Sequence, residues 1–229
     1  EIVTRTKTDK KNPDECLVNS VDLAGVTIIE SNIKGAIKTQ ADELPAGMFA
    51  GAKALKKVVL PSGLKSIGKE AFQTCESLPE IIIPSGVKTI ANEAFEDCKS
   101  ITTMQLPDGL TAIAPQLFNG CNALKSVNIP KGVKILGGSA FKNCKSLESL
   151  SLPASVTEIE TSVFYGCDNL ESVDMASVEK VGANAFTDCK SLKSASFDRI
   201  SSLGMIAFSN CTSLKSVKMQ GSLTDVNTR

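Results

Sequence analysis

Apolar residues return at a fixed interval along most of the chain, and the interval is clearest for phenylalanine. Neighbouring members of one Phe series lie 23 residues apart, or 22 residues apart in the last two steps. A unit this short cannot bury its own apolar face and must stack against its neighbours. The pattern therefore predicts a solenoid with one coil per repeat. The series comprises Phe49, Phe72, Phe95, Phe118, Phe141, Phe164, Phe186 and Phe208.

Each repeat follows the pattern A-F-x-x-C-x-x-L-x-x-V-x-L-P-x-G-V-K-x-I. The Leu-x-x-Val-x-Leu part alternates apolar and polar positions, which predicts a short strand with one buried face. The Pro and Gly that follow predict a turn. The Val-x-x-Ile part, such as Val87 to Ile90, predicts a second short extended segment. The Ala-Phe-x-x-Cys part predicts a single helical or 3₁₀ turn that buries Phe.

A cysteine series follows the Phe series three residues behind, with Ala52 in the first slot and Cys16 outside the series. We expect a structural ladder of buried thiols, each bonding weakly to a backbone carbonyl. Disulfides between adjacent coils are the alternative, although parallel Cβ vectors suit the bond poorly. Cysteines on a line cannot surround a zinc ion. The ladder comprises Cys75, Cys98, Cys121, Cys144, Cys167, Cys189 and Cys211.

These repeats resemble the leucine-rich repeats of the BspA-like type, whose signature is close to A-F-x-x-C-x-x-L-x-x-I-x-I-P-x-x-V-x-x-I. The resemblance covers roughly Leu44 to Gln220 and departs from the signature at Ala52 and at the turns of the last copies, which lack Pro. It implies an α/β repeat fold: a right-handed solenoid with a parallel concave sheet and short helical or 3₁₀ turns. It also implies a bacterial or protist surface or secreted protein, hence an extracytoplasmic location, often with an adhesin-like function.

The repeats divide the chain into three parts. Residues 1–43 form an N-terminal segment, residues 44–220 form the repeats, and residues 221–229 form a polar C-terminal tail. The strand-like stretch Val26 to Glu30 indicates an atypical first coil that caps the core, because an exposed end coil is an aggregation edge. The tail is very short for a cap, which suggests that the natural chain continues or that the last coil meets a partner.

Charge and composition remove several classes of function. The 25 basic and 25 acidic side chains balance, so we expect no nucleic-acid surface, which needs a basic stripe. The chain contains no His, which removes Ser-His-Asp and Cys-His catalysis and His-bound metals. No apolar run reaches the ~18 residues of a membrane span. We expect no catalytic residue, no cofactor and no metal, and therefore not an enzyme.

Binding is expected at the outward positions of the first strand of each repeat, because these positions vary while the core does not. A neighbouring outward column is rich in Ser, which is ordinary for a solvated sheet. The apolar residues at the N-terminal end are either a contact patch or are covered by the capping coil. The predicted partner-binding residues are Val59, Ile82, Gln105, Asn128, Ser151, Asp174, Ser196 and Lys218.

Two functions fit this picture. The first is a non-enzymatic protein- or glycan-binding module, an adhesin-like protein of the cell surface or a secreted one, which uses the concave sheet face. The second is a structural spacer or surface-coat element that self-associates or presents another domain. The identity of a partner and the role of Cys16 do not follow from the sequence.

Overall fold

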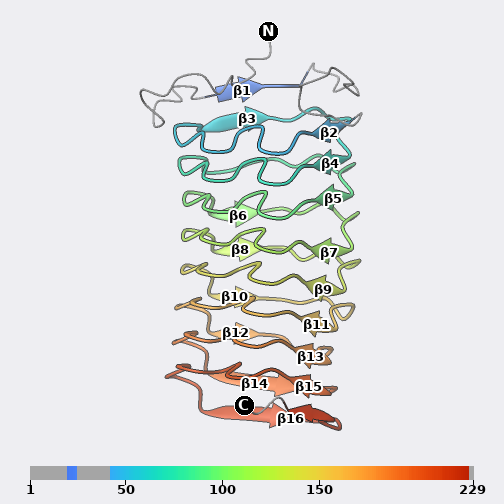
Figure 1. The fold of residues 1–229 in the computed structure, drawn as a ribbon, viewed down its shortest axis with the longest axis vertical. Coiled ribbons are helices and arrows are strands. Elements are labelled where there is room, and N and C mark those ends of the chain that lie inside the picture. The colour runs from blue at the N-terminus through green and yellow to red at the C-terminus, as the bar shows by residue number, and fades with distance from the viewer. Residues whose placement is uncertain (1–19, 25–41, 227–229) are drawn as a thin grey trace.

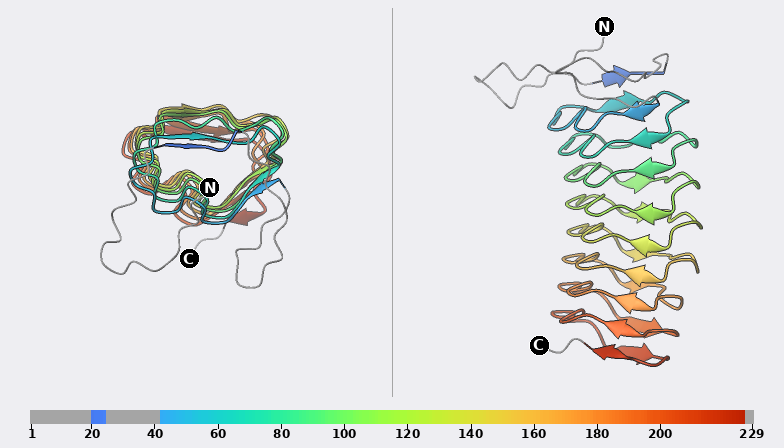
Figure 2. Two further views of the ribbon diagram at one scale, coloured as in Figure 1. Left: turned by 90° about the horizontal axis from the view of Figure 1, so that it is seen from above. Right: turned by 45° about the vertical axis from the view of Figure 1, so that its right-hand side comes forward.

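The computed structural model describes residues 20–24 and 42–226, and these form an elongated stack of coils (Figure 1). Each repeat makes one coil, and most coils contribute a short strand to each of two columns. Seen along the stack, successive coils follow nearly the same outline (Figure 2). All strand pairs in the described residues are parallel and join neighbouring coils. The chain is therefore the predicted solenoid.

The first column contains the Leu-x-x-Val-x-Leu strands, joined in four pairs: β1 with β3, β6 with β8, β10 with β12, and β14 with β16. Within each strand the outward residues are exposed and the inward ones mostly buried, as the alternation predicts. The strands are β1 (Ser20–Asp22), β3 (Lys57–Val59), β6 (Thr103–Met104), β8 (Ser126–Val127), β10 (Ser149–Leu150), β12 (Ser172–Val173), β14 (Ser194–Phe197) and β16 (Ser216–Met219).

The second column contains the Val-x-x-Ile segments after the Pro-Gly turns. It forms a three-stranded sheet near the N-terminal end and a six-stranded sheet over the rest of the stack. The strands are β2 (Glu43–Leu44), β4 (Ser66–Ile67), β5 (Thr89–Ile90), β7 (Ala112–Ile113), β9 (Ile135–Leu136), β11 (Glu158–Ile159), β13 (Lys180–Val181), β15 (Ser202–Leu203) and β17 (Asp225–Val226). The last strand, β17, pairs with β15, so strand pairing extends into the polar tail.

The predicted helical or 3₁₀ turn at Ala-Phe-x-x-Cys is wrong, and so is the α part of the predicted α/β repeat class, since the described residues form strands and turns but no helix of either kind. Backbone conformation is the reason. Glu93 (φ 61°) precedes Ala94 and Asp97 (φ 56°) precedes Cys98, so this turn contains two left-handed residues four positions apart. A right-handed helix needs negative φ throughout. The N–H of Phe95 instead donates to the carbonyl of Leu117 in the next coil (3.1 Å).

A continuous stack of aromatic rings fills the core under these turns. Each of the eight predicted Phe rings stacks on the next, with centroids 5.1–6.0 Å apart. The six from Phe72 to Phe186 are fully buried, whereas Phe49 and Phe208 at the ends are partly buried. Parallel offset rings at this separation gain contact beyond simple burial. The stack therefore joins all the coils into one core.

The turn that lacks Pro after β12 is held by a different contact. In a complete repeat the N–H of Val156 donates to the carbonyl of Pro153 (2.9 Å). In the shorter repeat the N–H of Val178 donates to the carbonyl of Met175 (3.0 Å). The Asp174 carboxylate also accepts the N–H of Ala176 (3.2 Å). An Asx-type contact thus replaces the fixed φ of Pro at this corner.

The described part of the N-terminal segment is consistent with a coil at that end. β1 pairs with β3 in register, with Val21 opposite Val58, and Leu23 packs into the core at 5% exposure. The strand expected at Val26 to Glu30 lies outside the described residues. Cys16 lies outside them as well.

Phe118→Ala should destabilise the protein by about 3–5 kcal/mol, because the cavity would interrupt the ring stack in the middle of the rod. Urea denaturation followed by circular dichroism measures this change. Ser149→Ala, on the exposed side of β10, is the control and should change the free energy of unfolding by less than about 0.5 kcal/mol. Equal effects of the two substitutions would contradict a packed Phe column.

Gly120→Ala should also destabilise the protein, by about 1–3 kcal/mol. Gly120 has φ +75°, and a Cβ there would clash with the Asp97 carboxylate in the preceding coil. Gly63 is a matched control, because a Cβ there meets no atom within 4 Å. Gly63→Ala should leave the urea midpoint almost unchanged, and a larger loss from Gly63→Ala than from Gly120→Ala would refute the assignment.

Candidate interaction surface

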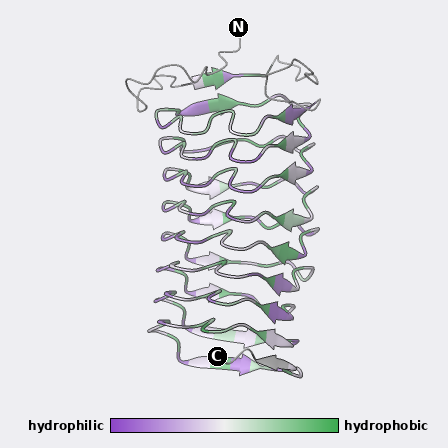
Figure 3. Ribbon diagram, viewed as in Figure 1, coloured by the Kyte–Doolittle hydropathy of each residue, from purple (hydrophilic) through white to green (hydrophobic). Residues whose placement is uncertain are grey.

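The outward side of the first strand column forms one long surface, which we call the open sheet face. It runs from β3 to β16 and includes the corresponding segment around Ile82, which lies between β3 and β6. Figure 3 shows that its hydropathy changes along the rod, from the hydrophobic end of β3 to the pale, mildly polar strands β6, β8 and β10. The strand colours combine inward and outward residues. In the sequence, one outward row changes from Val59 and Ile82 to polar residues such as Ser151, while the inward residues stay apolar.

The predicted partner-binding residues occupy one outward row of this face. Val59 and Asn128 are partly buried, and the other six are exposed. Ile82 stands out, because 85% of its surface is exposed, more than any other large apolar residue described. The row is Val59, Ile82, Gln105, Asn128, Ser151, Asp174, Ser196 and Lys218.

A proline interrupts the sheet beside Ile82. At the equivalent place in another coil the N–H of Lys125 donates to the carbonyl of Thr102 (2.8 Å). Pro79 occupies this position in the coil of Ile82 and has no N–H to donate. Accordingly, this coil forms no strand in the first column, and β6 is the next strand of the column after β3. Ile82 therefore projects from an unpaired stretch of backbone.

Two members of the row have their polar groups engaged within the chain. The Asn128 amide forms a pair of hydrogen bonds with the backbone of Leu106, accepting its N–H at 2.6 Å and donating to its carbonyl at 3.0 Å. Asp174 accepts the N–H of Ala176, as described above. Their side chains therefore stabilise the backbone of the solenoid. The sequence pattern, which shows only that they point outward, did not predict these hydrogen bonds.

A second outward row lies two residues earlier in each strand and is exposed throughout. It ends in five serines, which place small hydroxyl side chains side by side along the C-terminal half of the face. The short side chains leave the strand surface open to a partner. The row is Lys57, Glu80, Thr103, Ser126, Ser149, Ser172, Ser194 and Ser216.

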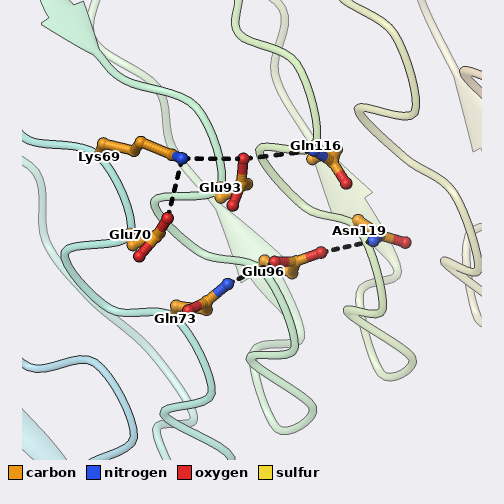
Figure 4. A network of polar contacts seen from close by, with 7 residues as sticks. All are labelled: Lys69, Glu70, Gln73, Glu93, Glu96, Gln116 and Asn119. Atoms are coloured by element: carbon orange, nitrogen blue, oxygen red, sulfur yellow. Dashed lines mark hydrogen bonds and ion pairs between the residues drawn. The ribbon is translucent and has the colours of Figure 1, made fainter. Parts of the chain in front are cut away.

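A polar network that the sequence did not predict covers the Phe turns of three neighbouring coils (Figure 4). The Glu96 carboxylate accepts hydrogen bonds from Gln73 in the preceding coil (2.6 Å) and Asn119 in the following one (2.7 Å). The Lys69 ammonium contacts Glu70 (2.9 Å) and Glu93 (3.6 Å). Gln73, Glu96 and Asn119 lie at equivalent repeat positions, so complementary polar residues 23 positions apart were the available sequence signal for this part of the network.

The network has mainly a structural effect. The hydrogen bond and the charge of Glu70, together with the charge of Glu93, raise the pKa of Lys69. Exposed ion pairs contribute little to stability because water and salt screen them. A similar contact between coils joins Lys190 to Asp168 (2.8 Å). These contacts align adjacent coils. Among the described residues, no group of three or more Cys, Asp or Glu side chains is placed to hold a metal ion.

The cysteines of the ladder lie beneath the Phe turns, and each thiol donates to the carbonyl of the Phe in the preceding coil. The Sγ of Cys144 lies 3.1 Å from the Phe118 carbonyl oxygen, and the other six distances lie between 3.0 and 3.2 Å. The six from Cys98 to Cys211 are free thiols. Burial raises the pKa of Cys144 well above its ordinary value, which keeps it protonated as a donor.

The last member of the ladder is different because no complete coil follows it among the described residues. Cys211 is only partly buried, and burial raises its pKa to about 11. It is therefore the described cysteine most open to reagents. No helix in the described part of the chain is long and apolar enough to cross a membrane.

Short parallel strands, one 22–23-residue coil per repeat and columns of Leu, Phe and Cys define the class: a leucine-rich repeat solenoid. The chain belongs to the BspA-type leucine-rich repeat family. The family's model, described as a BspA type leucine rich repeat region, matches six copies over residues 42–171 and 111–229. No curated protein matches the sequence.

Solved structures of bacterial proteins share the fold. A leucine-rich repeat protein of T. pallidum is 32% identical over 76% of this chain and 78% of its own, with a TM-score of 0.64. A leucine rich cell surface protein of Faecalibacterium prausnitzii is 23% identical over 89% and 70%, with a TM-score of 0.60. A leucine-rich repeat protein of Bacteroides ovatus is 28% identical over 77% and 64%, with a TM-score of 0.54.

Cys211 should react with iodoacetamide at least ~100-fold faster than Cys144 in the folded protein, because only Cys211 is partly exposed and its thiolate is less disfavoured. Its rate should rise about tenfold per pH unit below pH 11, as the thiolate fraction rises towards its pKa. Peptide mass spectrometry measures both sites in one sample, and urea-unfolded protein gives the control. Equal rates in the folded state would contradict the burial of the ladder.

Proposed function

We propose that this protein is a non-enzymatic binding module whose open sheet face holds a protein or glycan partner. The observation that carries the proposal is the contrast between a uniform core and a varied, exposed row of outward residues. A solenoid presents such a row as an extended surface on a rigid scaffold. Binding residues placed on rigid elements lose little conformational freedom when a partner docks.

The apolar end of the face is the best candidate for an anchor. Ile82 is 85% exposed, and Val59 in the neighbouring coil is partly exposed beside it. None of the residues described in the structure buries Ile82. Of the two alternatives for Val59 and Ile82, a contact patch or cover by the capping coil, we therefore adopt the contact patch. An exposed aliphatic side chain gains free energy when a partner removes it from water.

The polar remainder of the face would supply specificity. Gln105, Ser151 and Ser196 project hydroxyl or amide groups that both donate and accept hydrogen bonds. Lys218 adds a positive charge at the far end. Such groups suit either a protein backbone or sugar hydroxyls. The cell surface is the location we propose, because the family resemblance implies it and a relative from Faecalibacterium prausnitzii is described as a cell surface protein.

A binding screen against extracellular matrix proteins, mucins and glycan arrays tests the proposal with the whole chain. For a partner that binds, Ile82→Asp should weaken binding at least tenfold, because a charge would replace the apolar anchor. Surface plasmon resonance measures the change in dissociation constant.

Ala112→Asp provides the matched control, because Ala112 is an exposed apolar residue on β7 of the other strand column. This substitution should leave the dissociation constant within about twofold. Failure of the folded protein to bind any member of the screen would count against the proposal, as would equal losses from both substitutions.

A further inference from the structure

Exposed lysines gather along one corner of the rod, where the Pro-Gly turn leads into the second strand column. Lys65 and Lys88 immediately precede β4 and β5, and Lys134 holds the equivalent position two coils further along. Lys131 lies in the turn that leads to Lys134. All of these side chains are exposed. We call Lys65, Lys88, Lys131 and Lys134 the basic strip.

The backbone and the turn glycines set the direction of these side chains. The N–H of Lys88 donates to the carbonyl of Lys65 (2.8 Å), so the two residues are direct neighbours in adjacent coils. A Cβ on Gly86 would lie 3.3 Å from Lys65 Nζ, and a Cβ on Gly109 would lie 3.2 Å from Lys88 Cδ. Each lysine side chain therefore extends along the stack, into space that glycine leaves free in the next turn.

No acidic side chain among the described residues neutralises the basic strip. Other lysines form ion pairs, such as Lys69 with Glu93 and Lys190 with Asp168, but none of the strip lysines does so. Asp108 is the acidic residue of the intervening turn. In the row of Lys65, acidic residues stand only outside the ends of the strip, at Asp42 and Glu179. The strip is therefore a local excess of positive charge on a chain without net charge.

The spacing of the strip suits a linear polyanion. The Phe49 and Phe72 rings of the coils that carry Lys65 and Lys88 have centroids 5.2 Å apart, so equivalent residues repeat at about this distance along the stack. Charges this close lie within the ~8 Å over which physiological salt screens them. A partner with closely spaced anionic groups can therefore contact several ammonium groups at once.

Among polyanions, a sulfated glycan fits the surroundings of the strip best. An acidic peptide that adds to a sheet needs a free strand edge, but β4 is paired on one side with β2 and on the other with β5. Single-stranded nucleic acid is held by stacking on aromatic and Arg side chains, and the strip has neither. Ser62 and Ser85, exposed in the same turns, supply hydroxyl groups that suit those of a sugar.

We propose that the basic strip is a docking surface for a linear sulfated glycan. The sulfate groups contact the lysine ammonium groups, and the sugar hydroxyls bond the turn serines. Lysine acts as a point charge and not as a rigid fork, so binding depends strongly on salt and tolerates different sulfation patterns. The strip lies outside the outward rows of the open sheet face. This proposal therefore goes beyond the proposed function and does not rest on it.

Isothermal titration calorimetry of the whole chain with a heparin oligosaccharide of defined length tests the proposal. Heparin should bind at low ionic strength, and its affinity should fall as salt is added. Lys65→Gln, Lys88→Gln and Lys134→Gln together should raise the dissociation constant at least about tenfold. The matched control combines Lys125→Gln, Lys180→Gln and Lys215→Gln, which change the net charge equally at exposed positions outside the strip, and should stay within about threefold.

Further ligands and one further variant separate the alternatives. Desulfated heparin of the same length should not bind, and single-stranded DNA of equal charge should bind at least about tenfold more weakly than heparin. Ile82→Ser should leave the heparin dissociation constant within about twofold, which distinguishes this site from the open sheet face. Absence of heparin binding at low salt overturns the proposal. So do equal losses from the two triple variants, or DNA binding as tight as that of heparin.

Discussion

The contact between equivalent residues of neighbouring coils is the interaction on which the rest of the structure depends. No coil has a core of its own, because 22 or 23 residues are too few to enclose one. Phe95 packs on Phe72 and Phe118, and the Cys98 thiol donates to the Phe72 carbonyl. The ring contacts and the hydrogen bonds of a coil are thus both made with the adjacent coils. Each coil is stable only because the adjacent coils complete it.

This dependence separates structural residues from residues free to vary. Inward positions must match their equivalents in the adjacent coils, so Leu, Phe and Cys recur. Outward positions of the open sheet face have no such constraint and range from Ile82 to Lys218. The binding function proposed for that face rests on this freedom. Asn128 is an exception, because its amide bonds the backbone of Leu106 and so belongs in part to the scaffold.

The same dependence gives the last described coil its distinct chemistry. Phe208 has a ring on one side only in the main stack, although Phe197 also packs against its edge at 6.3 Å. Cys211 becomes accessible for the same reason, and Val217 and Met219 face solvent.

The sequence by itself determined the repeat length, the coil-by-coil stacking, the Phe column and the two strands of each coil. Burial of the same position in every coil requires an apolar residue there, and this produces a periodic sequence. It did not determine the turn at Ala-Phe-x-x-Cys, where a helix was wrongly predicted. At the slot of Asp97 most copies carry Gly, Asn or Asp, which tolerate a left-handed backbone, but the side chain of Glu93 gives no sign of one. Only the tertiary structure decided the left-handed backbone at Glu93, the Lys69–Glu93 contact and the hydrogen bonds of Asn128 to Leu106. Each of these features depends on contacts with an adjacent coil. The sequence of one repeat does not specify the distances in such contacts.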